Sequence, residues 1–194
     1  MARPKEFDRD VALGRALDVF WEKGYEATSI ADLVAATGVQ RQSMYDTFGD
    51  KQELFRAALD LYNTRSAAAF QALQGESASP LARLRCVFRS IASEATPGNR
   101  GCMLINSAVE RGLCDDRVIE CARTSNARLE RAIATMILAA QEAGEVPPGT
   151  SPKTAARVLV TLLWGLRAMG RAVPDPAWQR SVVDSALGLL ANDG

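Results

Sequence analysis

The stretch TSIADLVAATGVQRQSMYDTFGDK, residues 28–51, decides the fold because it reads as two short helices joined by a glycine turn. Ser29 and Asp32 have the spacing of a capping box, in which two side chains satisfy the free backbone N–H groups of a helix start. Glycine at position 38 can adopt the positive φ that ends a helix without steric cost. The stretch therefore predicts one helix that begins at Ser29 and a second that begins near Val39.

The second of these helices has an apolar side and a polar side. Val39, Met44 and Phe48 continue the apolar pattern. The outward groups are hydrogen-bonding side chains that suit base edges and phosphates, where an ordinary solvated face carries mainly Glu and Lys. We interpret this side as a DNA-reading surface, and a plain helical hairpin is the alternative. Its members are Gln40, Arg41, Gln42, Ser43 and Tyr45.

The first quarter of the chain resembles the N-terminal signature of the TetR family of transcriptional regulators. The resemblance implies an all-α fold, with a three-helix helix-turn-helix DNA-binding domain in residues 1–50 and a helical ligand-binding and dimerisation bundle in residues 51–194. It also implies a homodimeric repressor that binds a palindromic operator in double-stranded DNA and is released by a small-molecule effector. The matching positions are Leu13, Ala16, Leu17, Phe20, Gly24-Tyr25, Thr28-Ser29-Ile30, Gly38-Val39, Met44-Tyr45, Phe48 and Lys51.

Further DNA contacts are expected outside the second helix. The family motif adds Thr28, Ser29 and Lys51 to the contact set. Arg3 and Lys5 lie in an N-terminal arm that can reach a phosphate or the minor groove, although an ordinary disordered terminus is the alternative.

The charge balance does not by itself favour nucleic acid. The formal net charge is zero, and the first 55 residues hold seven basic and ten acidic side chains. A DNA-binding domain ordinarily shows a basic patch. The DNA-binding interpretation therefore requires Arg3, Lys5, Arg41 and Lys51 to share one face. An acidic N-terminal region favours the competing hypothesis of a helical protein-interaction module that does not bind DNA.

The last two predicted helices have more apolar surface than one small domain can cover. One begins at Pro152 and the other follows Pro174-Asp175-Pro176. Two-fold pairing would bury two helices of each chain in a four-helix bundle. We therefore expect a homodimer through the last two helices, with Leu187 and Leu190 at the interface, and interior helices of a monomer are the alternative.

Effector binding is expected in the C-terminal body. Large or polar side chains on the core-facing stripes are the candidate lining residues, and each also fits an ordinary core. They are Phe88, Met103, Asn106, Met136 and Trp164.

Cys102 offers a different trigger. It follows Arg100-Gly101 at a predicted helix start, where the helix dipole and a nearby cation lower the pKa of a thiol. Some TetR-type regulators look similar here and respond to oxidants, electrophiles or metals. The alternative function is therefore a redox or electrophile sensor, whereas a buried small side chain is the plainer interpretation.

The sequence lacks the residues that several classes of function require. The sequence has no histidine and none of the motifs GxSxG, GxxxxGK[ST] or GxGxxG, so we expect neither an enzyme nor a cofactor. Its four cysteines form no CxxC pair, which argues against a metal site. The apolar runs are too short to cross a bilayer and the N-terminus is charged, so we expect a cytoplasmic protein with no membrane contact.

Overall fold

The structure, a computed structural model, describes residues 7–73 and 79–191, and within these ranges every regular element is a helix. The chain divides into two compact units. The first unit comprises Met1–Arg65 and Met103–Ala122, and the second comprises Ser66–Cys102 and Arg123–Gly194. An all-α fold is what the sequence predicts.

Two of the three boundaries between the units fall inside long helices, and the third lies between Cys102 and Met103. Helix α4 runs from Lys51–Ala72 and α7 from Asp116–Glu142, so each contributes to both units. The first unit thus extends beyond the expected domain of residues 1–50. It also includes α6, Met103–Arg111, which is distant in sequence.

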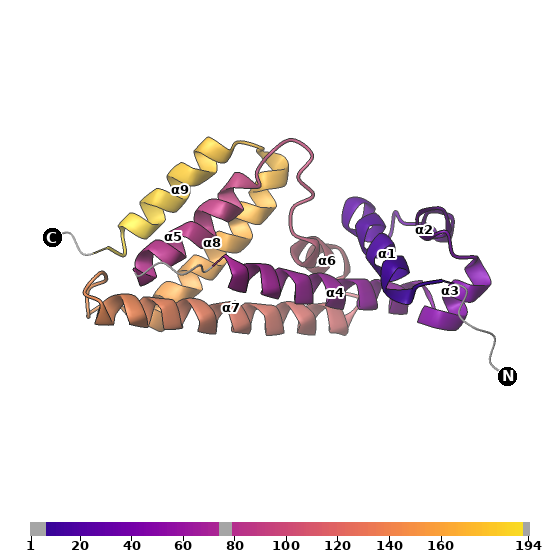
Figure 1. Cartoon of the computed structure of the whole chain (residues 1–194), viewed down its shortest axis with the longest axis horizontal. Coiled ribbons are helices and arrows are strands. Elements are labelled where there is room, and N and C mark those ends of the chain that lie inside the picture. Colours follow the sequence, from indigo (N-terminus) through magenta and orange to yellow (C-terminus); the bar gives the residue numbers. More distant parts are fainter. Residues whose placement is uncertain (1–6, 74–78, 192–194) are drawn as a thin grey trace. The chain divides into compact units, whose positions relative to one another are not determined.

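Three short helices begin the first unit: α1, Arg9–Lys23, α2, Ile30–Thr37, and α3, Arg41–Phe48 (Figure 1). Asp8 caps α1 through its side chain, which accepts from the N–H groups of the first turn. The apolar residues of α1 recur with the helical period and form one buried face. It consists of Ala12, Leu13, Ala16, Leu17 and Phe20.

The turn between α2 and α3 follows the local sequence signals. Ser29 Oγ accepts from the Asp32 N–H at 3.1 Å, and Asp32 Oδ2 accepts from the Ser29 N–H at 2.9 Å, so the predicted capping box is present. Gly38 has φ 73°, in the left-handed region, and ends α2 as predicted. Val39 and Met44 then anchor α3 in the core, since each is less than 5% exposed.

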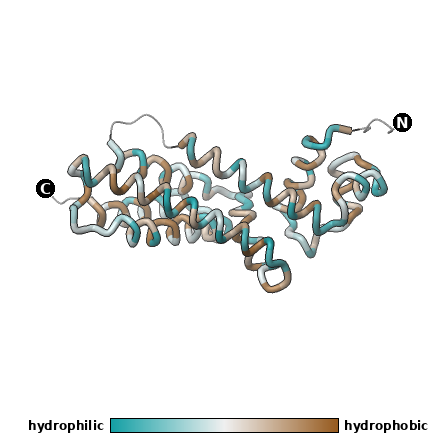
Figure 2. Tube along the Cα trace, turned by 90° about the horizontal axis from the view of Figure 1, so that it is seen from below, coloured by the Kyte–Doolittle hydropathy of each residue, from teal (hydrophilic) through white to brown (hydrophobic). Residues whose placement is uncertain are grey.

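The second unit is a helical bundle. Helices α5, Pro80–Ser93, α8, Pro152–Ala172, and α9, Pro176–Gly188, lie side by side (Figure 1). Apolar and polar residues alternate along the chain in the hydropathy colouring of Figure 2, the pattern of helices with one buried face. The fully buried centre includes Val87, Phe88, Ile133, Ala156 and Val183.

The expected position of Leu187 at a dimer surface is wrong. Leu187 is 0% exposed and belongs to the core of the second unit, because the apolar stripe of α9 that contains it faces the bundle. Leu190 is half-buried against the same core. In the described ranges, no helix is long and apolar enough to span a membrane.

Candidate nucleic-acid interface

Helix α3 presents the side chains that the sequence assigns to DNA reading. Gln40, Arg41 and Gln42 are exposed, whereas Ser43 and Tyr45 are half-buried. No side chain caps α3 within the described part of the chain, and Gln40 occupies the cap position. The first-turn N–H groups of α3 therefore gain no hydrogen bond from a capping side chain, and such groups attract phosphate oxygens.

Two contacts along α3 orient its polar side chains. The Arg41 guanidinium carbon lies 5.4 Å from the centre of the Tyr45 ring, a cation–π distance. Gln42 Nε2 donates to Asp46 Oδ1 at 2.9 Å. Asp46 is therefore a partner of the reading surface that sequence reasoning did not assign, although its spacing of four residues from Gln42 could have indicated it.

The start of α2 is stabilised from α1. Lys23 Nζ lies 2.6 Å from Asp32 Oδ1. Hydrogen bonds from Lys23 and Ser29 hold the pKa of Asp32 well below the usual value of a carboxyl group. Asp32 therefore stays ionised and keeps the Ser29 cap in place at neutral pH.

Thr28 was expected to contact DNA, but its side chain is buried. The residue is 1% exposed, and its hydroxyl donates to the Gly24 carbonyl at 2.5 Å. The hydroxyl is therefore occupied in closing the turn between α1 and α2. Ser29 is exposed, but its hydroxyl also bonds Asp32, at 2.7 Å.

Lys51, the first residue of α4, is half-buried and lies against Tyr25. Its ammonium nitrogen is 4.3 Å from the centre of the Tyr25 ring. Tyr25 packs edge-on against Phe55 with a centroid separation of 5.0 Å. The candidate phosphate contact is thus held by an aromatic cluster within the first unit.

Helix α6 holds the turn between α1 and α2. The Glu110 carboxylate accepts from the N–H groups of Tyr25 and Glu26 at 3.0 and 2.9 Å. Arg111 Nη1 lies 2.6 Å from Glu26 Oε1. Gly24 has φ 82°, a conformation that favours glycine, and a Cβ atom there would lie 2.9 Å from Glu110 Oε1, so the carboxylate would have to shift. No local sequence pattern indicates the hydrogen bonds to Glu110 or the ion pair between Arg111 and Glu26.

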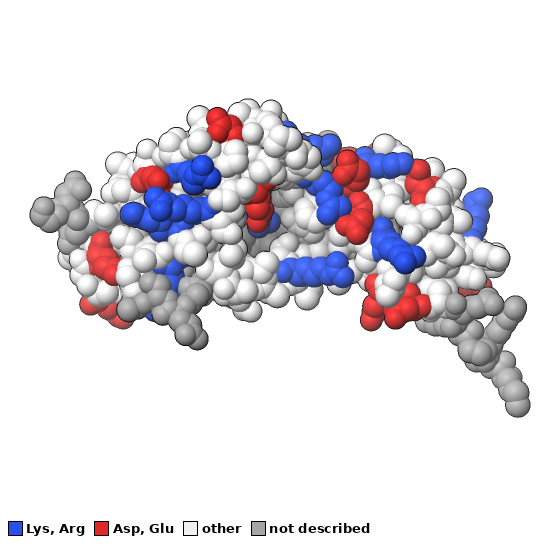
Figure 3. Space-filling view, turned by 45° about the horizontal axis from the view of Figure 1, so that its top comes forward, with Lys and Arg blue, Asp and Glu red and all other residues white. Residues whose placement is uncertain are grey.

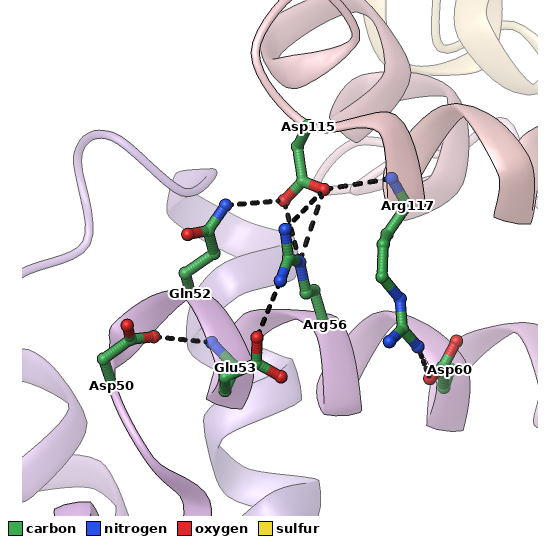
Figure 4. A network of polar contacts seen from close by, with 7 residues as sticks. All are labelled: Asp50, Gln52, Glu53, Arg56, Asp60, Asp115 and Arg117. Atoms are coloured by element: carbon green, nitrogen blue, oxygen red, sulfur yellow. Dashed lines mark hydrogen bonds and ion pairs between the residues drawn. The ribbon is translucent and has the colours of Figure 1, made fainter.

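A second polar network joins the starts of α4 and α7 (Figure 4). Arg56 binds Asp115 with two nitrogens and also contacts Glu53 at 2.6 Å. Gln52 Nε2 donates to the same Asp115 carboxylate at 3.1 Å. Burial raises the pKa of Asp115, but the hydrogen bonds from Arg56 and Gln52 outweigh it and leave the pKa below its usual value. The network therefore contains an ionised, buried carboxylate.

The surface charge is mixed. Figure 3 shows basic and acidic side chains next to one another on the face that it presents, without a continuous basic surface. Arg3 and Lys5, which were expected to extend a basic face, lie outside the described residues.

The five candidate ligand residues fall in different units. Phe88, Met136 and Trp164 belong to the core region of the second unit. Trp164 Nε1 donates to Asn126 Oδ1 at 3.1 Å, which gives this region a polar contact. Met103 and Asn106 lie on α6 in the first unit.

Cys102 directly precedes α6 and is 1% exposed. Cys86 and Cys114 are exposed, and Cys121 is half-buried. In the described part of the chain, no cluster of acidic or cysteine side chains has the arrangement of a metal site.

Two family models match the chain. Residues 12–58 match the model for bacterial regulatory proteins of the tetR family, and residues 80–185 match the model for the tetracyclin repressor-like C-terminal domain. The matches cover the helices of the candidate interface and most of the second unit.

Relatives and solved structures agree with these matches. The HTH-type transcriptional repressor ComR of Escherichia coli strain K12 is 37% identical over 174 residues, which cover 87% of this chain and 82% of ComR. The HTH-type transcriptional regulator YezE of Bacillus subtilis strain 168 is 32% identical over 98% of this chain and 100% of YezE. A cysteine mutant of the TetR family regulator CifR, solved with a 26-bp double-strand operator, is 28% identical with a TM-score of 0.81, over 97% of this chain and 100% of CifR.

Proposed function

The chain belongs to the TetR family of bacterial regulatory proteins and is a DNA-binding transcriptional regulator, and on that premise we propose that it is a repressor released from a palindromic operator by a small molecule. Family members act by binding DNA and are not enzymes. The repressor role is supported by the similarity to ComR, which is named a repressor. Its site of action is the bacterial cytoplasm, where an operator is accessible.

The observation that carries this proposal is the exposed polar side of α3. Arg41 and Gln42 are exposed on a helix whose other side is anchored by Met44, which is 2% exposed. Arginine and glutamine read guanine and adenine edges in the major groove through paired hydrogen bonds. Tyr45 and Lys51 are then assigned to phosphates, which set affinity and register rather than sequence.

Dimerisation through α8 and α9 is supported by apolar side chains that face solvent in the single chain. Val158 and Met169 on α8 are 61% and 40% exposed, and Trp178 on α9 is 43% exposed. Val158, Gly165 and Met169 fall on one stripe of α8 by helical periodicity. Apart from its chain neighbours and the adjacent backbone of α8, no atom of the described residues lies within 4 Å of the position that a Cβ at Gly165 would take, so a partner helix can approach closely there.

The effector is assigned to the second unit. Its matched C-terminal family domain and the contact between Trp164 and Asn126 support this placement, since ligand sites combine apolar walls with a few polar groups. Phe88 and Met136 are proposed to line the same region. A hundredfold loss of DNA affinity requires that the effector prefer the non-DNA conformation by about 2.7 kcal/mol.

The signal is proposed to travel through α4, because this helix contributes to both units. Its first residue, Lys51, is the assigned phosphate contact. A shift of α4 therefore displaces that contact directly. The ion pair of Arg56 with Asp115 links α4 to the start of α7, which gives a second route by which a change in the body reaches the same helix.

The experiment that tests the DNA-binding proposal is selection of binding sites from random double-stranded DNA with the purified full-length chain. We expect an enriched palindrome or near-palindrome whose half-sites lie about 34 Å apart, or a multiple of this, along the duplex. Light scattering should give the mass of a dimer for the free protein. Enrichment of a single unrepeated site by a monomer would contradict the proposal.

The repressor role is tested separately with a reporter gene. When the selected operator overlaps the promoter, expression of the chain should lower reporter activity, and the matched promoter with a scrambled operator should not respond. An increase in reporter activity would instead identify an activator. Small molecules that raise the melting temperature of the protein and release the operator duplex are then the effector candidates.

A further inference from the structure

Two cations lie over the same tyrosine ring in the first unit. Lys51 Nζ is 4.3 Å from the centre of the Tyr25 ring, and the Arg111 guanidinium carbon is also 4.3 Å from it. Both distances are well within the roughly 6 Å over which the π-electron face of a ring attracts a cation. Lys51 opens α4 and Arg111 closes α6, so one ring joins two helices that are far apart in sequence.

The ring itself is held from several sides. It packs edge-on against Phe55 at 5.0 Å and stacks with Phe20 at 6.3 Å between ring centres. The Tyr25 N–H donates to Glu110 Oε2 at 3.0 Å, so α6 also fixes the backbone that carries the ring. Burial raises the pKa of the Tyr25 hydroxyl, although the charge of Arg111 acts in the opposite direction. The ring therefore stays neutral at physiological pH.

Arg111, the second cation over the Tyr25 ring, is also bound to a carboxylate. Its Nη1 atom lies 2.6 Å from Glu26 Oε1, and this carboxylate offsets the charge that would otherwise repel Lys51. Arg111 is thus fastened by its own acidic partner while it packs on Tyr25. Lys51 is the cation on this ring that we assign to a DNA phosphate.

A lysine side chain is flexible, and binding a phosphate requires it to adopt one geometry. A ring that restricts the side chain before DNA arrives reduces the entropy lost on binding. We propose that Tyr25 is a positioning residue for Lys51: the ring holds the ammonium group ready for a DNA phosphate, and Glu110 and Arg111 of α6 hold the ring. The proposal rests on the proposed function, in which Lys51 contacts a phosphate.

The test separates the electronic effect of the ring from its shape. Tyr25→Phe keeps the ring, and mono-, di- and trifluorinated phenylalanines at position 25 then progressively remove the negative π face while nearly preserving the volume. Affinity of the full-length chain for the selected operator duplex is measured by fluorescence anisotropy at several KCl concentrations. We expect a stepwise loss that reaches about five-fold with three fluorines.

The same series is repeated in the Lys51→Ala background, where the affinity should no longer depend on fluorination. A trifluorinated phenylalanine at Phe70, a buried ring in the core of the second unit, controls for general effects of fluorine on the fold. Thermal melting of every variant verifies that the fold is intact.

The outcomes distinguish this proposal from the one on which it rests. If Lys51→Ala changes neither the affinity nor its salt dependence, the phosphate contact of Lys51 is wrong. If Lys51→Ala weakens binding but fluorination at position 25 has no effect, or has the same effect in both backgrounds, the phosphate contact stands and the positioning role of Tyr25 is overturned.

Discussion

Arg56 and Asp115 form a bidentate ion pair, in which Arg56 Nη2 lies 3.0 Å from Asp115 Oδ1 and Arg56 Nε lies 3.1 Å from Asp115 Oδ2. The Asp115 side chain is 1% exposed and that of Arg56 is 22% exposed. Arg56 also contacts Glu53. The pair therefore ties the start of α7 to the second turn of α4 inside the first unit.

Removing the charge of Asp115 should destabilise the first unit. For Asp115→Asn we expect the free energy of unfolding to fall by about 2 kcal/mol, because charge-assisted hydrogen bonds are lost while Arg56 keeps Glu53. At fixed protein concentration this corresponds to a melting temperature lower by about 4–8 °C. Asp60→Asn, which loses an exposed pair with Arg117, should cost less than about 1 kcal/mol. Equal losses in the two variants would contradict the buried role of Asp115.

The contribution of Asp115 should depend on pH in a defined direction. Its pKa in the folded protein is below the ordinary value of 3.8, so its stabilisation is present above that value and is lost as the pH falls through the folded-state pKa. The difference in unfolding free energy between wild type and Asp115→Asn should be constant from pH 7 to about pH 5 and should shrink below about pH 4. Urea unfolding across this range measures it. A difference that grows on acidification would refute the assignment.

The exposed side chains of α3 should carry operator affinity. Arg41→Ala and Gln42→Ala should each weaken binding to the selected operator by about 1–3 kcal/mol, with fold and dimer unchanged. Their effect on random-sequence duplex should be smaller, because base contacts specify sequence. Arg131→Ala and Gln71→Ala, exposed residues of the second unit, are the matched controls. Wild-type affinity in both α3 variants would remove α3 as the reading helix.

The apolar stripes of α8 and α9 should govern assembly. Val158→Glu and Trp178→Glu place a charge on surfaces that are 61% and 43% exposed in the single chain, so they should dissociate the dimer without unfolding the bundle. Val109→Glu changes an equally apolar residue of α6 that is 83% exposed and should leave the dimer intact. Sedimentation equilibrium measures the association constant. Dissociation by Val109→Glu alone would place the interface elsewhere.

Thiol reactivity should follow exposure. Cys86 and Cys114 are exposed and should react first with N-ethylmaleimide, whereas Cys102, at 1% exposed, should react last in the native protein. Mass spectrometry of peptides after partial labelling gives the order. Fast and selective modification of Cys102, with release of the operator, would instead establish the sensor alternative.

Local signals explain why the helices of the first unit could be predicted from sequence. The capping box of Ser29 and Asp32 and the positive φ of Gly38 depend on residues within a few positions of one another, and both were confirmed. The buried stripe of α1 follows the helical period for the same reason. Burial of Leu187 could not be predicted, because periodicity indicates that α9 has an apolar side but not which neighbour covers it.

The contacts that α6 makes with the turn between α1 and α2 could not be predicted from sequence patterns. The Glu110 carboxylate accepts a hydrogen bond from the Tyr25 N–H, although the two residues are 85 positions apart in the sequence. Because the carboxylate binds backbone N–H groups, the contact does not depend on which side chains stand at the donor positions. Thr28 was misassigned for a related reason. A threonine in the family motif suits either a phosphate or an internal carbonyl, and only the turn geometry shows that Gly24 accepts its hydroxyl.

The hydrogen bonds from the Tyr25 and Glu26 N–H groups to the Glu110 carboxylate limit how chimeras of such regulators can be designed. A chimera that joins residues 1–50 of this chain to the body of another regulator would transplant the reading helices without the carboxylate that fastens them. A module that also carried residues 51–65 and 103–122 would keep the whole set of contacts. For engineering a biosensor with a new effector, the transferable part of this protein is therefore discontinuous in sequence, and the splice points belong inside α4, between Cys102 and Met103, and inside α7.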